Sequence, residues 1–317
     1  MRPATMELQR RLRGPGCGRT AGNTARITVR VVRAAHLHVF GCVRGSLRGG
    51  GRRRRPWFEE RRVSGWTEPD HRSPVRLIAL TFALSVPFWL AGAVAGRLSE
   101  TLPVSALMAC CPLLAAMLLV RRHEPRGAVK RLLQRVVDWR AAPRPGRWHA
   151  LAIALPLGVM AGSYAVMVLL GRSLPGLRVS LVEVPLLFAV FLVAAACEEA
   201  GWTAYATDPL SARWGPPVTG VILGVTWAVW HIVPYAQAGH GPLWIAGQCL
   251  YTVALRVVIV WLYLHSTSVL TAVVCHAASN VGWSLFPGSH YDPVVTGGIA
   301  IVVALLVVTA WPRPFSR

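Results

Sequence analysis

The sequence predicts an all-α polytopic membrane protein, a bundle of about eight transmembrane helices. Hydrophobic residues make up 54% of the 317 residues, whereas charged residues make up only 15%. Apolar runs of roughly 17 to 25 residues, the length that crosses a bilayer as a helix, recur between positions 76 and 311. A transmembrane β-barrel would need alternating apolar and polar residues, so these continuous runs argue against one.

The eight expected spans follow one another along the chain. They cover residues 76–96, 103–120, 149–170, 184–206, 217–236, 243–264, 268–285 and 293–311. A polar or turn-forming segment separates each run from the next. In chain order these segments contain Arg97 and Glu100, the basic stretch 121–147, Arg172 with Arg178 and Glu183, Gly215-Pro216-Pro217, His240, His265-Ser-Thr267, and Asp292.

The distribution of basic residues orients the spans in a cell membrane. The stretch between the second and third spans holds nine of them: Arg121, Arg122, Arg126, Lys130, Arg131, Arg135, Arg140, Arg144 and Arg147. Short loops rich in Lys and Arg stay on the cytoplasmic side, so we expect this stretch there. With eight spans, both termini are then cytoplasmic as well.

Residues 1–75 differ from the transmembrane part, residues 76–317. They hold 17 arginines against 5 acidic residues, and the run 49–56 reads Gly-Gly-Gly-Arg-Arg-Arg-Arg-Pro. Such a composition cannot bury a core, so we expect a disordered cytoplasmic segment, or a stretch that precedes the true start of translation. Arginine-rich segments are typical of the cytoplasmic side of membrane proteins, and we expect no nucleic-acid partner. The seven cysteines form no Cys-x-x-Cys pair, which argues against a disulfide framework.

Two adjacent carboxylates, Glu198 and Glu199, interrupt the fourth span. An ionised carboxylate at the bilayer centre costs at least about 2.5 kcal/mol. A chain keeps such a pair where it faces a polar cavity, binds a partner or does chemistry. The alternative is that the membrane boundary falls here and the pair is interfacial.

Two later spans carry polar residues one helical turn apart. Trp227 and His231 share a face of the fifth span, and His276 and Asn280 share a face of the seventh. Glu199 lies 16 residues before Gly215 and His231 lies 15 residues after Pro216, so a hairpin at this turn places both at similar depth.

These residue types suit hydrolytic chemistry. A carboxylate beside an imidazole can deprotonate a water, either directly or through a metal, and Glu198, His231 and His276 are acceptable zinc ligands. A histidine and an asparagine can donate hydrogen bonds to an oxyanion. The alternative for each residue alone is an interhelical hydrogen bond.

The three groups resemble the CPBP family of intramembrane metalloproteases, which includes CAAX proteases and bacteriocin-processing enzymes and is also called the Abi family. The family pattern is E-E-x-x-x-R, then F-x-x-x-H, then H-x-x-x-N on successive membrane helices. Here it reads Glu198-Glu199 with Thr203, Trp227 with His231, and His276 with Asn280. The resemblance covers residues 184–285.

The resemblance implies an intramembrane endopeptidase that acts on a membrane-associated protein or on a C-terminal, CAAX-like peptide. By the same resemblance Glu198 is the base and His231 helps to position the water. His276 and Asn280 then stabilise the oxyanion. Whether a zinc ion takes part, or water activated by glutamate alone, stays open at this point.

Two residues depart from the family pattern. Trp227 replaces phenylalanine, which we interpret as a mild change in an aromatic wall. Thr203 replaces the motif arginine, which favours a second interpretation: a catalytically degenerate scaffold or immunity-type protein. A third interpretation is a proton-coupled transporter, although the helices show no inverted repeat.

Arg256, inside the sixth span, offers a substitute for the missing arginine. An arginine at this depth needs a buried partner. Of the acidic residues from the fourth span onward, only Glu198 and Glu199 lie deep in a span. We therefore hypothesise that Arg256 pairs with Glu199; the alternative partners are backbone carbonyls or a lipid phosphate.

Overall fold

The computed structural model describes residues 72–96, 103–172, 174, 182–285 and 291–310. The chain divides into two compact units, 1–63 and 64–317, and every described residue belongs to the second. The predicted N-terminal segment, 1–75, therefore lies almost entirely outside the described residues.

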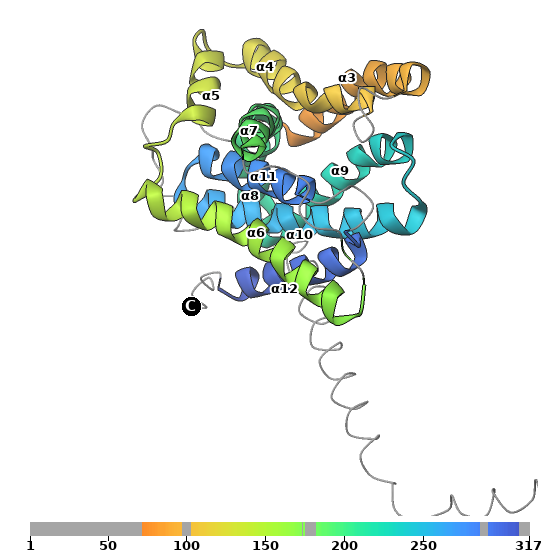
Figure 1. Ribbon diagram of the computed structural model, residues 1–317. Helices are drawn as coiled ribbons and strands as arrows, with labels where there is room; N and C mark the ends of the chain where they lie inside the picture. Colours follow the sequence, from red (N-terminus) through yellow and green to blue (C-terminus); the bar gives the residue numbers. More distant parts are fainter. Residues whose placement is uncertain (1–71, 97–102, 173, 175–181, 286–290, 311–317) are drawn as a thin grey trace, which may run out of the picture. The chain divides into compact units, whose positions relative to one another are not determined.

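All regular structure in the described ranges is helical (Figure 1). In chain order the elements are α3 (Pro74–Ala95), η2 (Val104–Cys110), α4 (Cys111–His123), α5 (Ala128–Val137), α6 (Pro145–Leu169), α7 (Glu183–Gly201), η3 (Trp202–Thr207), α8 (Asp208–Trp214), α9 (Pro216–Gln237), α10 (Pro242–Ser266), α11 (Val269–Ser284) and α12 (Pro293–Thr309). The all-α class is thus confirmed.

Six helical segments in the described part of the chain are long and apolar enough to cross a membrane. They are Pro74–Ala95, Val104–His123, Pro145–Leu169, Glu183–Trp214, Pro216–Gln237 and Pro242–Ser266. The protein is a multi-pass membrane protein. Helices also occupy the last two predicted spans, but α11 has 16 residues and α12 has 17, so the count of eight and the orientation of the termini stay predictions.

One helix, α5, was not predicted. It lies in the basic stretch between the second and third spans, and its buried residues are Ala128, Leu132 and Val136. Their spacing of four is that of one helical face. The high density of charge in this stretch concealed the short apolar pattern.

Small residues bring α9 and α10 into close contact. A Cβ added to Gly220 would lie 2.9 Å from the Cα of Val257, and one added to Gly224 would lie 2.8 Å from the Cα of Val253. Close approach at small residues is a common way to associate helices in a membrane, where lipid tails are as apolar as leucine. This close packing holds Arg256 of α10 against α9, and the arginine side chain is fully buried there.

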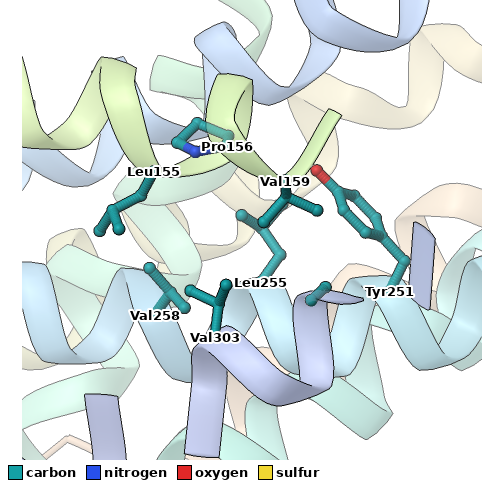
Figure 2. Close-up of a pocket in the computed structure, with 8 residues that line it drawn as sticks. Leu155, Pro156, Val159, Tyr251, Leu255, Val258 and Val303 are labelled. Carbon is teal, nitrogen blue, oxygen red and sulfur yellow. The ribbon is translucent and has the colours of Figure 1, made fainter. Parts of the chain in front are cut away.

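Another face of α10 packs against α6 and α12. Figure 2 shows a small apolar recess there, in which Leu155 and Val159 of α6 face Leu255 and Val258 of α10. None of the predicted site residues lines it. The polar residues of the spans therefore gather elsewhere around α10.

The fourth span changes its helical form directly after the two glutamates. Residues Trp202–Thr207 (η3) form a π-helix, and all six are buried. The carbonyl of Ala204 in this segment accepts hydrogen bonds from Arg72 Nη1 at 3.0 Å and from Arg135 Nη1 of α5 at 2.9 Å. Single π-helical turns frequently mark functional sites, and this one is held in place by two arginines from outside the span.

Candidate active site

Glu199 lies at the centre of a buried polar network. Its side chain is 0% exposed and accepts hydrogen bonds from three others. Arg256 binds it through two nitrogens, Nη1 to Oε2 at 2.6 Å and Nη2 to Oε1 at 3.0 Å. His276 Nδ1 lies 2.9 Å from Oε1, and the Thr203 hydroxyl donates to Oε2. Both oxygens of Glu199 are therefore fully occupied.

The pairing of Arg256 with Glu199 confirms the hypothesis drawn from the sequence. The guanidinium is also 0% exposed, and α10 delivers it from a helix other than the one that carries the glutamates. A two-nitrogen arginine–carboxylate pair is among the strongest polar contacts in a protein interior. The positive charge that the family pattern puts at position 203 is present here, supplied by position 256.

Glu198 has different surroundings, although it is the next residue along α7. It is 5% exposed, and Trp227 Nε1 donates to its Oε2 at 2.7 Å. Among the described residues, no other side chain donates a hydrogen bond to Glu198. Its second oxygen, Oε1, is therefore available to a water or a substrate.

Trp227 connects the parts of the site. Its indole N–H binds Glu198, while the guanidinium carbon of Arg256 lies 4.1 Å from its ring centroid, the geometry of a cation–π contact. The ring of His276 meets it edge-on at 4.8 Å, and that of His231 at 5.6 Å. Trp227 does pack against aromatic rings as we expected, and it also offers Glu198 an N–H that phenylalanine lacks; whether the replacement is mild stays a prediction.

His231 is held by aromatic rings on several sides. Its Nδ1 lies 2.9 Å from the carbonyl of Trp227, so the Nδ1–H donates and Nε2 is left as the acceptor of a neutral ring. Trp230 meets the imidazole edge-on at 4.8 Å, and Tyr235 stacks on it at 5.6 Å. The structure places His231 beside Trp227, and Trp227 separates it from the Glu199 network.

Asn280 lies one turn beyond His276 on α11 and is half-buried. Ser279, between them, hydrogen-bonds Tyr251 of α10 at 2.7 Å, which fixes this part of α11 against α10. No hydrogen bond joins the Asn280 side chain to the other predicted site residues, all of which are described. Its predicted role in binding an oxyanion stays a prediction.

The predicted zinc ligands do not fit a metal as they are placed. In the described ranges, no three His, Cys, Asp or Glu side chains lie together so that they could hold a metal ion. Nδ1 of His276 is engaged by Glu199, and Nδ1 of His231 by the Trp227 carbonyl. Zinc binding by Glu198, His231 and His276 stays a prediction, and no step below depends on it.

A family model places this site among known proteins. Residues 180–282 match the model described as type II CAAX prenyl endopeptidase Rce1-like. This chain carries an Rce1-like domain. The domain contains every predicted site residue, from Glu198 to Asn280, and it agrees with the resemblance to CAAX proteases that the motifs carry.

A curated relative also aligns with the chain. It is CAAX prenyl protease 2 of Methanococcus maripaludis, 25% identical over 134 residues. The aligned part covers 39% of this chain and spans about half of the relative, 49% of its length. The family match places similarity to a protease at residues 180–282, and the chain spans about half the length of this curated relative.

Sequence reasoning missed three contributors to the site. The Thr203 hydroxyl binds Glu199, so this residue takes part in the site even though it replaces an arginine. Arg135 and Tyr263, 2.6 Å apart, hold the far end of the π-helix through Ala204 and Asp208. The sequence did offer one signal for Arg135: Asp208 is a lone acidic residue at the end of a span, and such a residue needs a basic partner.

Proposed function

We propose that this protein is an intramembrane endopeptidase that hydrolyses a peptide bond with water activated by Glu198. One observation carries the proposal. Of two adjacent buried carboxylates, Glu199 is saturated by Arg256, His276 and Thr203, while Glu198 keeps one oxygen without a partner. A general base must be within hydrogen-bond reach of the proton it removes, and only Glu198 has an oxygen to offer.

In the proposed reaction, Glu198 Oε1 accepts a proton from water as the water oxygen attacks the carbonyl carbon of the scissile bond. Trp227 holds the other oxygen, Oε2, and thereby fixes the direction in which Oε1 points. His231, whose ring meets Trp227 edge-on, accepts the second water proton as a hydrogen bond through Nε2. The tetrahedral intermediate then collapses, and the departing amine takes the proton from Glu198.

The negative charge of the intermediate needs hydrogen-bond donors nearby. Glu199 orients His276 through Nδ1, which leaves Nε2 as the nitrogen that faces away from the network. We assign His276 Nε2–H and the amide of Asn280 to the oxyanion. Arg256 contributes by holding Glu199, and so acts as a positioning residue.

The substrate class follows from the Rce1-like domain and from the location of the site. The curated relative is a CAAX prenyl protease, and the two glutamates, Trp227, His231 and Arg256 lie in helical segments long and apolar enough to cross a membrane. We propose a membrane-associated peptide or protein, cleaved near a CAAX-like C-terminus or within a segment at the membrane. The lipid bilayer is the second partner.

The interpretation as a non-catalytic scaffold rested on Thr203. Its main support weakens because Arg256 provides the charge that Thr203 lacks, at 2.6 Å from Glu199. Nothing in the described residues favours the proton-coupled transporter. Catalysis is therefore the proposal that the contacts support best.

The test compares new peptide termini in cells. Wild type, Glu198→Gln and the control Cys197→Ala are expressed at matched levels in a host that lacks the native copy, and all protein termini are identified by mass spectrometry. Termini present with wild type and Cys197→Ala, and absent with Glu198→Gln, are expected and name the substrate. Identical termini in all three, with each protein folded in the membrane, would reject proteolysis.

The same samples test the zinc prediction separately. Elemental analysis of the purified wild type reports bound zinc directly, and a chelator added to the membrane fraction reports whether cleavage needs it. Zinc at one equivalent that is lost in each of Glu198→Gln, His231→Ala and His276→Ala would support the predicted ligand set. Cleavage that continues in a metal-free preparation would favour glutamate-activated water alone.

A further inference from the structure

The helix α5 presents two different faces. One face is buried against α4, α7 and α11 through Ala128, Leu132 and Val136. The opposite face contains Lys130, Leu133, Gln134 and Val137, all exposed, at the spacing of three and four residues that makes a single stripe. Leu133 is 39% exposed and Val137 66%. A helix that displays both cations and large aliphatic groups outward is unusual for a surface that meets only water.

Cations surround this stripe. The exposed basic residues from the last turn of α4 to the first turn of α6 are Arg121, Arg122, Arg126, Lys130, Arg140, Arg144 and Arg147. The same segment has two acidic residues, and both are engaged: Glu124 pairs with Arg72 at 2.8 Å, and Asp138 accepts the backbone N–H of Arg140 at 3.0 Å. The surface therefore carries a large excess of positive charge.

An exposed tryptophan follows α5. Trp139 is 55% exposed, and the guanidinium of Arg140 lies 5.3 Å from its ring centroid. Tryptophan is enriched where the hydrocarbon core of a membrane meets the headgroups, because its ring is apolar and its N–H polar. Leu133, Val137 and Trp139 together supply the apolar part of a surface whose other part is cationic.

The position of α5 in the chain fixes where this surface lies. α4 ends at His123 and α6 begins at Pro145, and both belong to membrane-spanning segments. In Figure 1, α5 lies between the ends of these two helices, beside α7. α5 is thus tethered at both ends within a few residues of a segment that can cross the membrane, near the level at which these segments leave the bilayer.

We propose that this surface, formed by Arg126, Lys130, Leu133, Val137, Trp139 and Arg140, binds anionic phospholipids. The cations bind headgroup phosphates, and the three apolar side chains enter the boundary between headgroups and acyl chains. Exposed apolar and aromatic side chains with basic residues beside them are the combination by which an interfacial helix binds an anionic membrane. An acidic soluble protein would match the cations but would leave Leu133 and Val137 without an apolar partner.

The binding is measured on the purified full chain in an uncharged detergent. Native mass spectrometry follows titration with phosphatidylglycerol or with phosphatidylcholine of the same acyl chains. Wild type is expected to prefer phosphatidylglycerol. Each cation near an anionic lipid surface contributes about a fivefold gain in binding, so Arg126→Gln with Lys130→Gln is expected to lower the affinity for phosphatidylglycerol about 25-fold.

A matched control removes the same charge elsewhere. Arg76 and Arg213 are exposed and lie outside α5, so Arg76→Gln with Arg213→Gln is expected to change the affinity less than twofold. A second variant, Leu133→Ser with Val137→Ser, is expected to weaken both lipids alike. The variant Arg126→Lys with Lys130→Arg changes the same two positions but keeps both charges. It is expected to bind as wild type, which shows that altering these side chains does not by itself disrupt binding.

Two results would overturn the proposal. One is a wild type that does not distinguish phosphatidylglycerol from phosphatidylcholine, and the other is an equal loss in the α5 pair and in the control pair. Saturable binding of polyglutamate in place of the lipid would assign the surface to an acidic protein and would also overturn it. None of these measurements depends on peptide cleavage, so this proposal and the proposed protease activity can fail separately.

Discussion

Glu198 and Glu199 are neighbours in α7, yet their side chains meet two very different environments. Glu199 accepts hydrogen bonds from an arginine of α10, a histidine of α11 and a threonine of its own span. Glu198 accepts one, from an indole of α9, and keeps an open oxygen. The same functional group therefore serves twice, once to hold helices together and once to remain reactive.

The difference shows how a membrane site can keep a reactive carboxylate. Burial of two adjacent charges is expensive, and unpaired buried charge destabilises a fold strongly. Here Arg256 pairs with Glu199 through two nitrogens. Glu198 makes no ion pair with this arginine and keeps an oxygen for chemistry. The saturated glutamate supports the fold around the open one. Variants that exchange or remove these contacts test this division of roles.

The largest expected effect comes from removing the arginine. Arg256→Leu leaves Glu199 buried without its charge partner, and breaking a buried pair in this way costs about 3 to 5 kcal/mol. We expect a matching drop in the free energy of unfolding, measured by denaturant titration in detergent micelles. Arg213→Leu, at an exposed arginine, serves as the control and should change it little.

Moving the arginine sharpens the same prediction. Thr203→Arg combined with Arg256→Leu puts the cation where the family pattern has it, one turn from Glu199. We expect the double variant to regain at least half of the stability that Arg256→Leu alone loses. A double variant that is as unstable as the sum of the two single changes would mean that Glu199 does not need a cation specifically.

The second effect concerns activity alone. Glu198→Gln keeps an oxygen for Trp227 but cannot take a proton from water, and general bases contribute about 10² to 10⁴-fold. We expect cleavage to fall by at least about 10²-fold while the thermal midpoint changes little. For Glu199→Gln we expect the opposite: the thermal midpoint falls markedly, because Arg256 loses its charge partner. If Glu198→Gln and Glu199→Gln changed cleavage and the thermal midpoint by the same amounts, the assignment of a catalytic role to one glutamate and a structural role to the other would be wrong.

A smaller effect is expected at Trp227. Trp227→Phe restores the family residue and removes the N–H that binds Glu198 at 2.7 Å. Loss of one hydrogen bond to a charged group costs about 1.5 to 3 kcal/mol, so cleavage should fall about tenfold or more while substrate binding is maintained. Separate values of kcat and KM, measured on the substrate found from the termini, distinguish a loss of turnover from a loss of substrate binding. Unchanged kcat would show that Glu198 needs no orientation by the indole.

The smallest effect is expected at Thr203. Thr203→Val keeps the shape of the side chain and removes its hydroxyl, while Arg256 and His276 still occupy Glu199. We expect a loss of about 1 kcal/mol in the free energy of unfolding, typical of one hydrogen bond. Thr207→Val, in the same π-helix, is the matched control, because its hydroxyl donates to the backbone carbonyl of Trp202 and not to Glu199. A larger loss in the control would indicate that the free energy of unfolding depends on the hydrogen bonds within the π-helix more than on the contact with Glu199.

Much of this arrangement could be predicted from the sequence. Apolar runs gave the positions of the helices, because span length and hydrophobicity are set by the bilayer itself. The partner of Arg256 could be predicted because an arginine in a span demands a buried acid, and few acids were available. Such constraints are strong wherever a charge must be satisfied in an apolar medium.

Other parts were beyond prediction because they depend on distances between helices. The indole of Trp227 reaches Glu198 only through the packing of α7 against α9, and nothing in the local sequence distinguishes it from a wall residue. The π-helix after Gly201 adds a residue to one turn, which periodicity in an all-apolar segment does not reveal. The short helix α5 was hidden among its own charges.

Arg256 also has a consequence for the history of this site. Because α10 and α7 share one guanidinium, positions 203 and 256 should vary together: a chain with arginine at the first should carry an uncharged residue at the second, and the reverse. A pattern written along a single helix treats this chain as having lost its arginine. The charge itself is retained, because Arg256 of α10 pairs with Glu199 while position 203 carries a threonine.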